Sequence, residues 1–339
     1  MGRARKDADK WMPPRVYCGK SAFEFRPKGG GCIRLCPLSA PKSTVWRRYE
    51  QEVKRLEMVG GSFSELVGEY MKAPQFKELA PRTQKDYQGY WLKIEPVFGK
   101  AKAAIIEPAH IRAYMDKKGQ KSKTQANREK AFMSAVFRWG FERGKVTKNP
   151  CQGVKAFKEN ARVRYVTDAE YTLLHSIAPA HVQAAMEIAY LCAARKGDVL
   201  DIKKGQLQEE GIYIKQGKTG KAQIKQWTPR LRAAINLASK VKSTIDTMYV
   251  IHTKQGQRYT ESGFDAAFRL AKIEAQKQSD KKELGLKIDF TFHDLKAKGI
   301  SDYEGDKQRF SGHKTASQVA RYDRKINVVE TLDTTKKSK

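Results

Sequence analysis

The chain lacks the marks of a membrane or secreted protein. Its 339 residues contain no apolar run of about 18 residues, which is the length that a membrane-spanning helix needs. The charged start MGRARKDADK is not followed by the apolar segment of a signal peptide. We therefore expect a soluble, cytoplasmic protein without a membrane partner.

Cysteine is scarce and irregularly spaced. The five cysteines are an odd number and form no disulfide framework; they are Cys18, Cys32, Cys36, Cys151 and Cys192. The first three lie near one another in the sequence, but no fourth metal ligand lies close by. We expect buried thiols and no metal site.

Acidic residues are few beside basic ones, with 37 Asp and Glu against 67 Lys and Arg and a formal net charge of +30. A field of this size repels itself unless a polyanion neutralises it. Nucleic acid is therefore the expected partner, with binding that weakens steeply as salt rises. An anionic membrane surface is the rival partner.

Residues 1–60 predict a small β module followed by a helix. The segments RVYC, AFEFR and CIRLC are separated by turns, and Phe23 and Phe25 alternate with charged residues, which is the period of a half-buried strand. A helix-like charged stretch then leads to a flexible Gly60-Gly61 joint. Basic residues surround the strands and favour a minor DNA-contacting module, among them Arg3, Arg5 and Lys6. The alternative is a solvated β-rich extension.

Residues 62–150 predict a small helical domain. Ser62 and Glu65 make a capping box ahead of an amphipathic helix, and Asn149-Pro150 ends the helical region. Further helical patterns span 82–96, 108–117 and 123–143. The cations that we expect to contact DNA from this domain are Arg82, Lys123 and Arg128.

Residues 160–339 predict a domain that is mostly α with a small β insertion. Helical patterns precede and follow two strands, GIYIKQ and AQIKQW, which flank a KTGK turn. The fold class predicted for the chain is thus mainly α with small β elements (α+β).

Four separated segments of this last domain carry the candidates for chemistry. They hold Arg195, Lys218, the pair His293 and Lys296, and the pair His313 and Tyr322. Taken singly, each of these residues has a simpler interpretation. Arg195 could be a surface cation, Lys218 a solvated turn lysine, and either histidine a core residue. Positions 293 and 296 face the same way on a helix, however, so an imidazole and an ammonium can address one anion. A free phenol has a pKa of about 10, so a nucleophilic tyrosine needs cations or a base beside it.

These segments resemble the signature of the tyrosine recombinases, and specifically of the phage integrases. In that family an Arg, a hairpin Lys, a His-x-x-Arg, a Gly-His and a Tyr nine residues later recur in this order. The resemblance covers about 160–325. The 62–150 segment resembles the family's helical core-site-binding domain, and MGRARK with WMPPRVY resembles the arm-site-binding N-terminal domain of lambda-type integrases.

The resemblance implies a site-specific recombinase that integrates, and also excises, a mobile element. Tyr322 would attack a DNA phosphorus, form a 3′-phosphotyrosyl link and release a 5′-hydroxyl. Arg195 and His313 would hold the phosphate, and Lys218 would protonate the leaving oxygen. His293 would assist proton transfer or hold the phosphate. No metal or cofactor is implied.

Four residues qualify this assignment. Asp198 would orient Arg195 or the neighbouring histidine. Lys296 stands where the family has its second arginine, and an ammonium cannot make the bidentate contact of a guanidinium. Lys221 and Lys225 are alternatives to Lys218 as the hairpin lysine.

The resemblance also implies partners. They are double-stranded DNA with core-type and arm-type attachment sites, three further copies of the chain in a tetramer, a host DNA-bending protein and an excision factor, all in the bacterial cytoplasm. The apolar tail KINVVETL would dock on a neighbouring protomer or pack on its own domain. The competing functions are a DNA-binding relative without catalysis and a type IB topoisomerase-like strand transferase.

Overall fold

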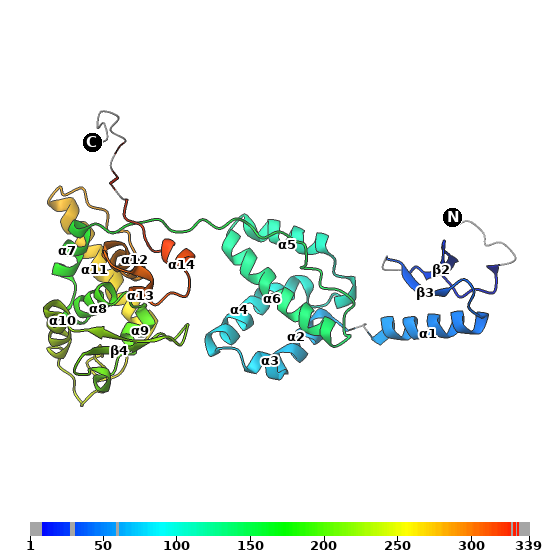
Figure 1. The fold of residues 1–339 in the computed structure, drawn as a ribbon, viewed down its shortest axis with the longest axis horizontal. Helices are drawn as coiled ribbons and strands as arrows, with labels where there is room; N and C mark the ends of the chain where they lie inside the picture. Colours follow the sequence, from blue (N-terminus) through cyan, green and yellow to red (C-terminus); the bar gives the residue numbers. More distant parts are fainter. Residues whose placement is uncertain (1–8, 28–30, 59–60, 327, 330, 332–339) are drawn as a thin grey trace, which may run out of the picture. The chain divides into compact units, whose positions relative to one another are not determined.

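The computed structural model describes residues 9–27, 31–58, 61–326, 328, 329 and 331. The chain divides into two compact units, residues 1–160 and 161–339, and each is described by itself. The described residues are mostly helical with two small antiparallel sheets, which confirms the predicted fold class (Figure 1).

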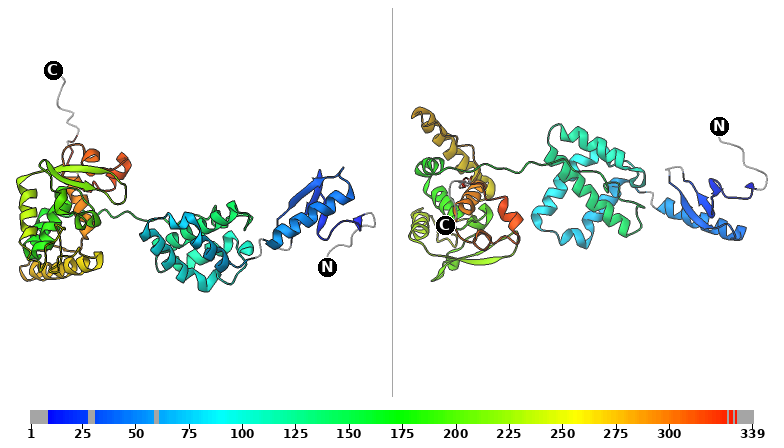
Figure 2. Two further views of the ribbon diagram at one scale, coloured as in Figure 1. Left: turned by 90° about the horizontal axis from the view of Figure 1, so that it is seen from below. Right: turned by 45° about the horizontal axis from the view of Figure 1, so that its top comes forward.

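The N-terminal residues form a three-stranded antiparallel sheet with one helix on it (Figure 2). Phe23 and Phe25 point into the small core between the sheet and the helix, as their alternation with charged residues predicts. The elements are β1 (Val16–Cys18), β2 (Ala22–Phe25), β3 (Ile33–Pro37) and α1 (Lys42–Met58).

Residues 63–154 surround a second apolar core made by packed helices. The capping box of Ser62 and Glu65 is present at the start of α2, and Phe63 stacks on Phe137 of α6 at a ring distance of 4.7 Å. The elements are α2 (Phe63–Lys72), α3 (Pro74–Lys77), α4 (Pro81–Phe98), η2 (Ala103–Ile105), α5 (Pro108–Gly119) and α6 (Lys123–Glu142).

The second unit is built around α8, whose side chains are buried on nearly every side. Helices α7, α10 and α12 pack on it, and the β4–β5 hairpin follows α9 in the sequence. The elements are α7 (Asp168–Ile177), α8 (Ala180–Leu191), α9 (Lys196–Leu200), η3 (Lys204–Gln206), β4 (Gly211–Lys215), β5 (Ala222–Gln226), α10 (Pro229–Ser239), α11 (Glu261–Lys281), α12 (Phe292–Asp302), α13 (Lys307–Ser311) and α14 (Ala316–Ala320).

A close backbone approach seats α12 on α8. A Cβ at Gly299 would lie 2.1 Å from the Tyr190 carbonyl oxygen, so only glycine fits at this crossing. Because α12 carries His293 and Lys296, this contact fixes the depth at which both side chains enter the domain.

The three described apolar residues of the tail beyond Lys325 are exposed. Ile326, Val328 and Val329 are 91%, 100% and 77% exposed. No helix in the described part of the chain combines the length and apolar composition that crossing a membrane takes.

The expectation of buried thiols is wrong for two of the cysteines. Cys36, Cys151 and Cys192 are buried, but Cys18 and Cys32 are exposed. In β1 only Val16 faces the core, and Cys32 lies outside the strands, where its thiol contacts a Glu24 carboxylate oxygen at 3.2 Å. Among the described residues, no group of three or more His, Cys, Asp or Glu side chains could hold a metal ion.

Candidate active site

Tyr322 lies just after α14 and packs against its own domain. Its backbone N–H donates to the Val319 carbonyl at 2.8 Å, and its ring packs on a small apolar cluster of Ala193, Ile300 and Val319. Figure 1 shows α14 beside α12 and α13. The C-terminal segment therefore brings the phenol to the helix that carries His293.

Both candidate histidines contact the Tyr322 side chain. The His293 Nε2 atom lies 3.2 Å from the phenol oxygen, and the His313 ring stacks on the Tyr322 ring with centroids 4.8 Å apart. Burial, together with the charge of Lys296, lowers the pKa of His293. The same causes lower the pKa of His313 to about 4. Both imidazoles are therefore neutral near pH 7, and neutral His293 can accept the phenolic proton.

Arg195 enters the site as the N-cap residue of α9. Two residues earlier, Ala193 has a φ of 49°, a left-handed conformation that is unfavourable for a residue with a Cβ. Ala193 packs against Ile300 of α12, and such strain persists only where surrounding contacts enforce it. The sharp turn out of α8 thus aims the guanidinium into the site.

Gln216 holds the Arg195 guanidinium more closely than Asp198 does. The Gln216 Oε1 accepts from Arg195 Nη1 at 2.8 Å, whereas Asp198 Oδ2 lies 3.8 Å away from the same nitrogen. Asp198 accepts instead from the Gly217 backbone N–H at 2.9 Å. Gln216 was missed in the sequence, where nothing distinguishes it from other hairpin residues.

The turn before His313 is organised by the same glutamine. Gln216 Nε2 donates to the Ser311 carbonyl at 3.0 Å, and Gly312 has a φ of 70°, which favours glycine. The Ser311 hydroxyl lies 2.7 Å from His313 Nδ1. The buried His313 Nε2 has no hydrogen-bond partner among the described residues, so it is available to an incoming group.

Lys296 is a buried ammonium without a counter-charge in contact. It is 1% exposed, and its Nζ makes no hydrogen bond to any described residue. Burial and the nearby Arg195 lower the pKa of Lys296 to about 7. Its Nζ lies 5.7 Å from the centre of the Tyr322 ring. The site therefore concentrates unsatisfied donors around one phenol, an arrangement that suits an anion.

The three hairpin lysines differ in their surroundings. Lys218 and Lys221 are exposed in the turn between β4 and β5, and Lys225 is half-buried on β5. Lys225 donates to the Phe310 carbonyl, and burial lowers the pKa of Lys225 to about 8. Lys225 is thus bound to the end of α13, whereas Lys218 lies exposed in the turn.

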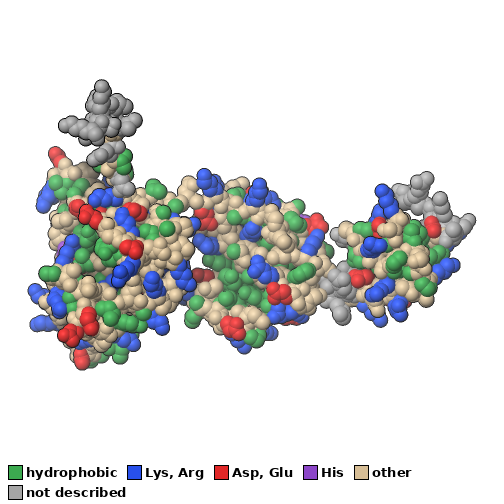
Figure 3. Space-filling model, in the orientation of Figure 1, with side chains coloured by type: hydrophobic (Ala, Val, Ile, Leu, Met, Phe, Trp, Pro, Cys, Tyr) green, Lys and Arg blue, Asp and Glu red, His purple; other side chains and the backbone are tan. Residues whose placement is uncertain are grey.

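The cations predicted to contact DNA from the helical domain are exposed near the starts of two helices. Arg82 and Arg128 have side chains 78% and 60% exposed, and Lys123 begins α6 and is also exposed. Lys and Arg side chains are spread over the visible face of each part of the chain (Figure 3). Arg3, Arg5 and Lys6 lie outside the described residues.

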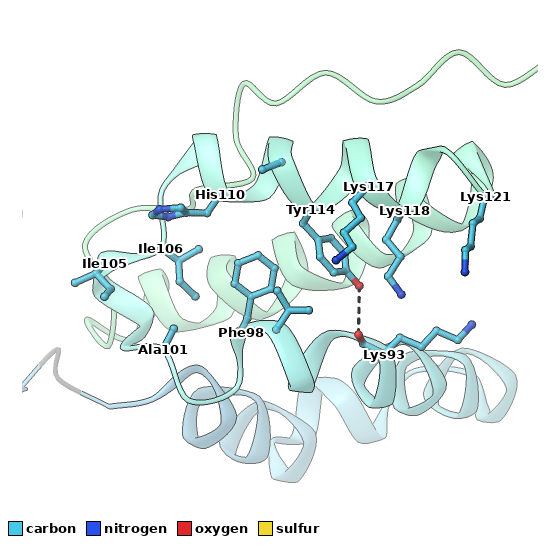
Figure 4. A pocket seen from close by; sticks show the side chains of 12 residues that line it. Lys93, Phe98, Ala101, Ile105, Ile106, His110, Tyr114, Lys117, Lys118 and Lys121 are labelled. Atoms are coloured by element: carbon cyan, nitrogen blue, oxygen red, sulfur yellow. Dashed lines mark hydrogen bonds between the residues drawn. The ribbon is translucent and has the colours of Figure 1, made fainter.

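A cavity of about 750 Å³ lies elsewhere in the helical domain, between α4 and α5. Its lining is largely apolar, with Phe98 and Ile106 at one end and lysines such as Lys118 at the other (Figure 4). The Tyr114 hydroxyl donates to Glu129 Oε2 at 2.6 Å, and burial raises the pKa of Tyr114. This tyrosine is therefore a satisfied structural group and a poor nucleophile.

Comparison with known proteins gives consistent matches. The model of the phage integrase central domain matches residues 63–156, and that of the phage integrase family matches residues 164–327. The integrase of Enterobacteria phage 434 is 26% identical over 201 residues, which are 56% of this chain and 55% of that protein. The integrase of Escherichia phage HK022 is 24% identical over 95% of this chain and 96% of that protein.

Solved structures show the same fold. A lambda integrase tetramer bound to a Holliday junction is 18% identical, with a TM-score of 0.68 over 97% of this chain and 99% of that chain. A lambda integrase dimer bound to a COC′ core site has the same TM-score over 97% of this chain and 100% of that chain, at 19% identity.

Replacing Lys296 by Met should raise the thermal stability of the free protein. A methionine of similar length removes an amine that is buried without a partner, and we expect a gain of about 1–2 kcal/mol, or roughly 2–6 °C in melting temperature. The folded chain holds the Lys296 proton less tightly than the unfolded chain does. The gain should therefore be largest below pH 7 and shrink as pH rises toward the ordinary lysine pKa.

The matched control is Lys298→Met, two residues along the same helix. Lys298 is equally buried but binds Asp168 at 2.6 Å and Asp302 at 2.9 Å, so its loss leaves carboxylates without their cation and should lower the melting temperature. Scanning calorimetry of both variants checks the contrast. A lower melting temperature for Lys296→Met than for the wild type would contradict the view of Lys296 as an unsatisfied group.

Proposed function

Because this chain belongs to the phage integrase family of tyrosine recombinases, we propose that it cuts and rejoins duplex DNA at specific sites through a 3′-phosphotyrosyl intermediate, to integrate and excise a mobile element. The observation that carries this proposal is the phenol of Tyr322, which contacts His293 and His313 in a site with unsatisfied cationic and polar donors.

In the proposed reaction the Tyr322 oxygen bonds to the scissile phosphorus as the bond from phosphorus to the 5′ oxygen breaks. Neutral His293, 3.2 Å from the phenol oxygen, accepts the phenolic proton. The leaving 5′ oxygen takes a proton from Lys218 and becomes a hydroxyl. The phosphodiester is exchanged for a phosphotyrosyl ester, so the reverse attack by a 5′-hydroxyl can rejoin the strand without an external energy source.

Three donors would hold the phosphate during this exchange. Arg195 would contact the non-bridging oxygens, and the buried, unpartnered Lys296 Nζ and His313 Nε2 would gain their missing partner there. Charge develops on these oxygens in the transition state, so donors already in place lower its energy. Asp198 and Gln216 would orient Arg195. Lys296 would supply one point contact where a guanidinium gives two.

Two alternatives fit the residues less well. A DNA-binding relative without catalysis has no need of a phenol seated against two imidazoles. A type IB topoisomerase-like strand transferase would use similar chemistry, but the match to the phage integrase central domain over residues 63–156 favours the recombinase.

The proposal extends to domains and partners. Residues 62–150 would bind core-type DNA, with Arg82, Lys123 and Arg128 on phosphates, residues 1–60 would bind arm-type sites, and residues 160–339 would catalyse. Four copies would act together on DNA, assisted by a host DNA-bending protein and an excision factor in the bacterial cytoplasm. The exposed apolar tail supports association between copies.

The wild-type chain should form a covalent adduct with a nicked suicide duplex. The DNA is taken from the sequence that flanks the gene, where the attachment site of the element is expected. Cleavage next to the nick releases a short fragment and traps the phosphotyrosyl bond, which denaturing electrophoresis detects. Tyr322→Phe keeps the ring but has no nucleophilic oxygen, so its adduct should disappear while DNA binding persists. A wild-type chain that binds this duplex specifically and forms no adduct would favour the inert binder.

Lys218→Ala should slow adduct formation by about 100-fold or more, because the leaving oxygen then lacks a positioned acid. Replacing that bridging oxygen by sulfur should restore the rate, since a thiolate leaves without protonation. Lys225→Ala is the matched control from the same hairpin. If sulfur instead rescues Lys225→Ala and has no effect on Lys218→Ala, the hairpin assignment is reversed.

A chain with Arg3→Gln, Arg5→Gln and Lys6→Gln should bind DNA that carries an outlying arm-type site more weakly than the wild type does. The slope of log Kd against log salt should become shallower by about 3, since each lost phosphate contact contributes about 0.9. Binding to core-only DNA should not change. Glutamines at Lys336, Lys337 and Lys339 serve as the control. Equal losses on both DNAs would remove the arm-site proposal.

A further inference from the structure

The segment that carries Tyr322 is pinned to α12 by residues that do not touch the phenol. Ser301 Oγ donates to the Tyr322 carbonyl at 3.0 Å and accepts from the Arg324 N–H at 2.7 Å. Asp323 pairs with Lys307 at 2.7 Å. The tyrosine segment is therefore held by bonds to its own backbone and to the two residues that follow the phenol.

The most deeply buried of these contacts joins Asp294 and Arg324. Asp294 Oδ1 accepts from Arg324 Nη1 at 2.6 Å, and the two side chains are 1% and 8% exposed. A second bond from Arg324 Nη1 reaches the Arg164 carbonyl at 3.0 Å. A buried, charge-assisted pair of this kind holds its partners more rigidly than an exposed one.

Asp294 is the residue after His293 in the sequence, so the Asp294–Arg324 ion pair lies beside the contact between His293 and Tyr322. One turn of α12 places the imidazole against the phenol oxygen and the carboxylate against the arginine two residues after the phenol. These two of the contacts between α12 and the tyrosine segment start from neighbouring residues, so the carboxylate helps to fix the register in which the phenol meets the imidazole.

A simpler interpretation makes Asp294 only the cap of α12. Its Oδ2 accepts from the Thr291 N–H at 2.7 Å and from the Thr291 hydroxyl at 2.8 Å, and Arg162 Nε lies 3.0 Å from the same oxygen. The bond to Arg324 uses the other oxygen, Oδ1. The two tasks are therefore separable by experiment.

We propose that Asp294 is a positioning residue that acts through Arg324 to hold Tyr322 in register with His293. The inference rests on the proposed function, because it gives Tyr322 the role of nucleophile. A misplaced nucleophile slows its own attack even when binding is intact, and a displacement of about 1 Å lowers a rate by about 100-fold.

The test measures the single-turnover rate of adduct formation by the full-length chain at saturating nicked suicide duplex. Asp294→Asn and Arg324→Met should slow this rate by about 10- to 100-fold, with DNA affinity, measured in the Tyr322→Phe background, within about twofold of the parent. Arg324→Lys, which keeps the charge, should lose less than Arg324→Met and serves where the methionine variant does not fold.

Two controls separate positioning from other roles. Thr291→Ala weakens the cap without removing the Asp294–Arg324 pair, so it should lower the melting temperature and leave the adduct rate within about twofold. Sulfur at the 5′ bridging position should not rescue Asp294→Asn or Arg324→Met, because their defect lies in attack and not in leaving-group departure.

The possible results are distinct. If Asp294→Asn and Arg324→Lys react at the wild-type rate, or if sulfur restores the slowed variants, Asp294 does not position the nucleophile. The positioning role is also overturned if Thr291→Ala matches Asp294→Asn in rate and melting temperature, since the cap then explains both. A wild-type chain that forms no adduct overturns the proposed function itself.

Discussion

The candidate site of the second unit buries cationic and polar donors close together, at a cost that the surrounding fold must offset. Arg195, Lys296 and the two imidazoles lie around one phenol, and Asp198, the carboxylate 3.8 Å from Arg195, accepts a hydrogen bond from the Gly217 backbone. Burial and mutual repulsion lower the pKa of Lys296 to about 7 and that of His313 to about 4. An anion held among these groups would oppose both shifts, because it favours the protonated forms. Under the proposed function, a DNA phosphate in the site would offset the cost of burying these donors.

This charge can be tolerated because the surrounding fold is rigid. The approach of Gly299 to the Tyr190 backbone fixes α12, and the left-handed turn at Ala193 fixes the start of α9. Gln216 then links Arg195 to the Ser311 carbonyl, so hydrogen bonds join the hairpin, the start of α9 and the turn before His313. Donors held in this way need little rearrangement when charge develops on the phosphate.

Local patterns in the sequence predicted much of this arrangement. The alternation at Phe23 and Phe25, the capping box at Ser62 and the spacing of His293 and Lys296 each depend on a few neighbouring residues, so period and chemistry suffice. Gln216, Ser301 and Asp294 were missed because their partners lie 95, 21 and 30 residues away. The residues next to a polar side chain in the sequence do not indicate which distant residue it will bond to. The exposure of Cys18 was missed for a related reason, since burial in a short edge strand depends on what covers it.

The burial of position 296 also bears on why a lysine and not an arginine can stand there. A guanidinium has five N–H donors in a plane, whereas an ammonium has three. In a buried site with few acceptors, an arginine would therefore leave more donors unsatisfied than a lysine does. An ammonium can also release its proton when it is buried, which lowers the penalty of the empty state. A lysine at position 296 thereby gives up bidentate geometry for a smaller cost in the free protein. In the same domain Lys298, with two carboxylates in contact, keeps a raised pKa. Burial lowers the pKa of both lysines, but the two carboxylates in contact with Lys298 outweigh it there, whereas burial prevails at Lys296.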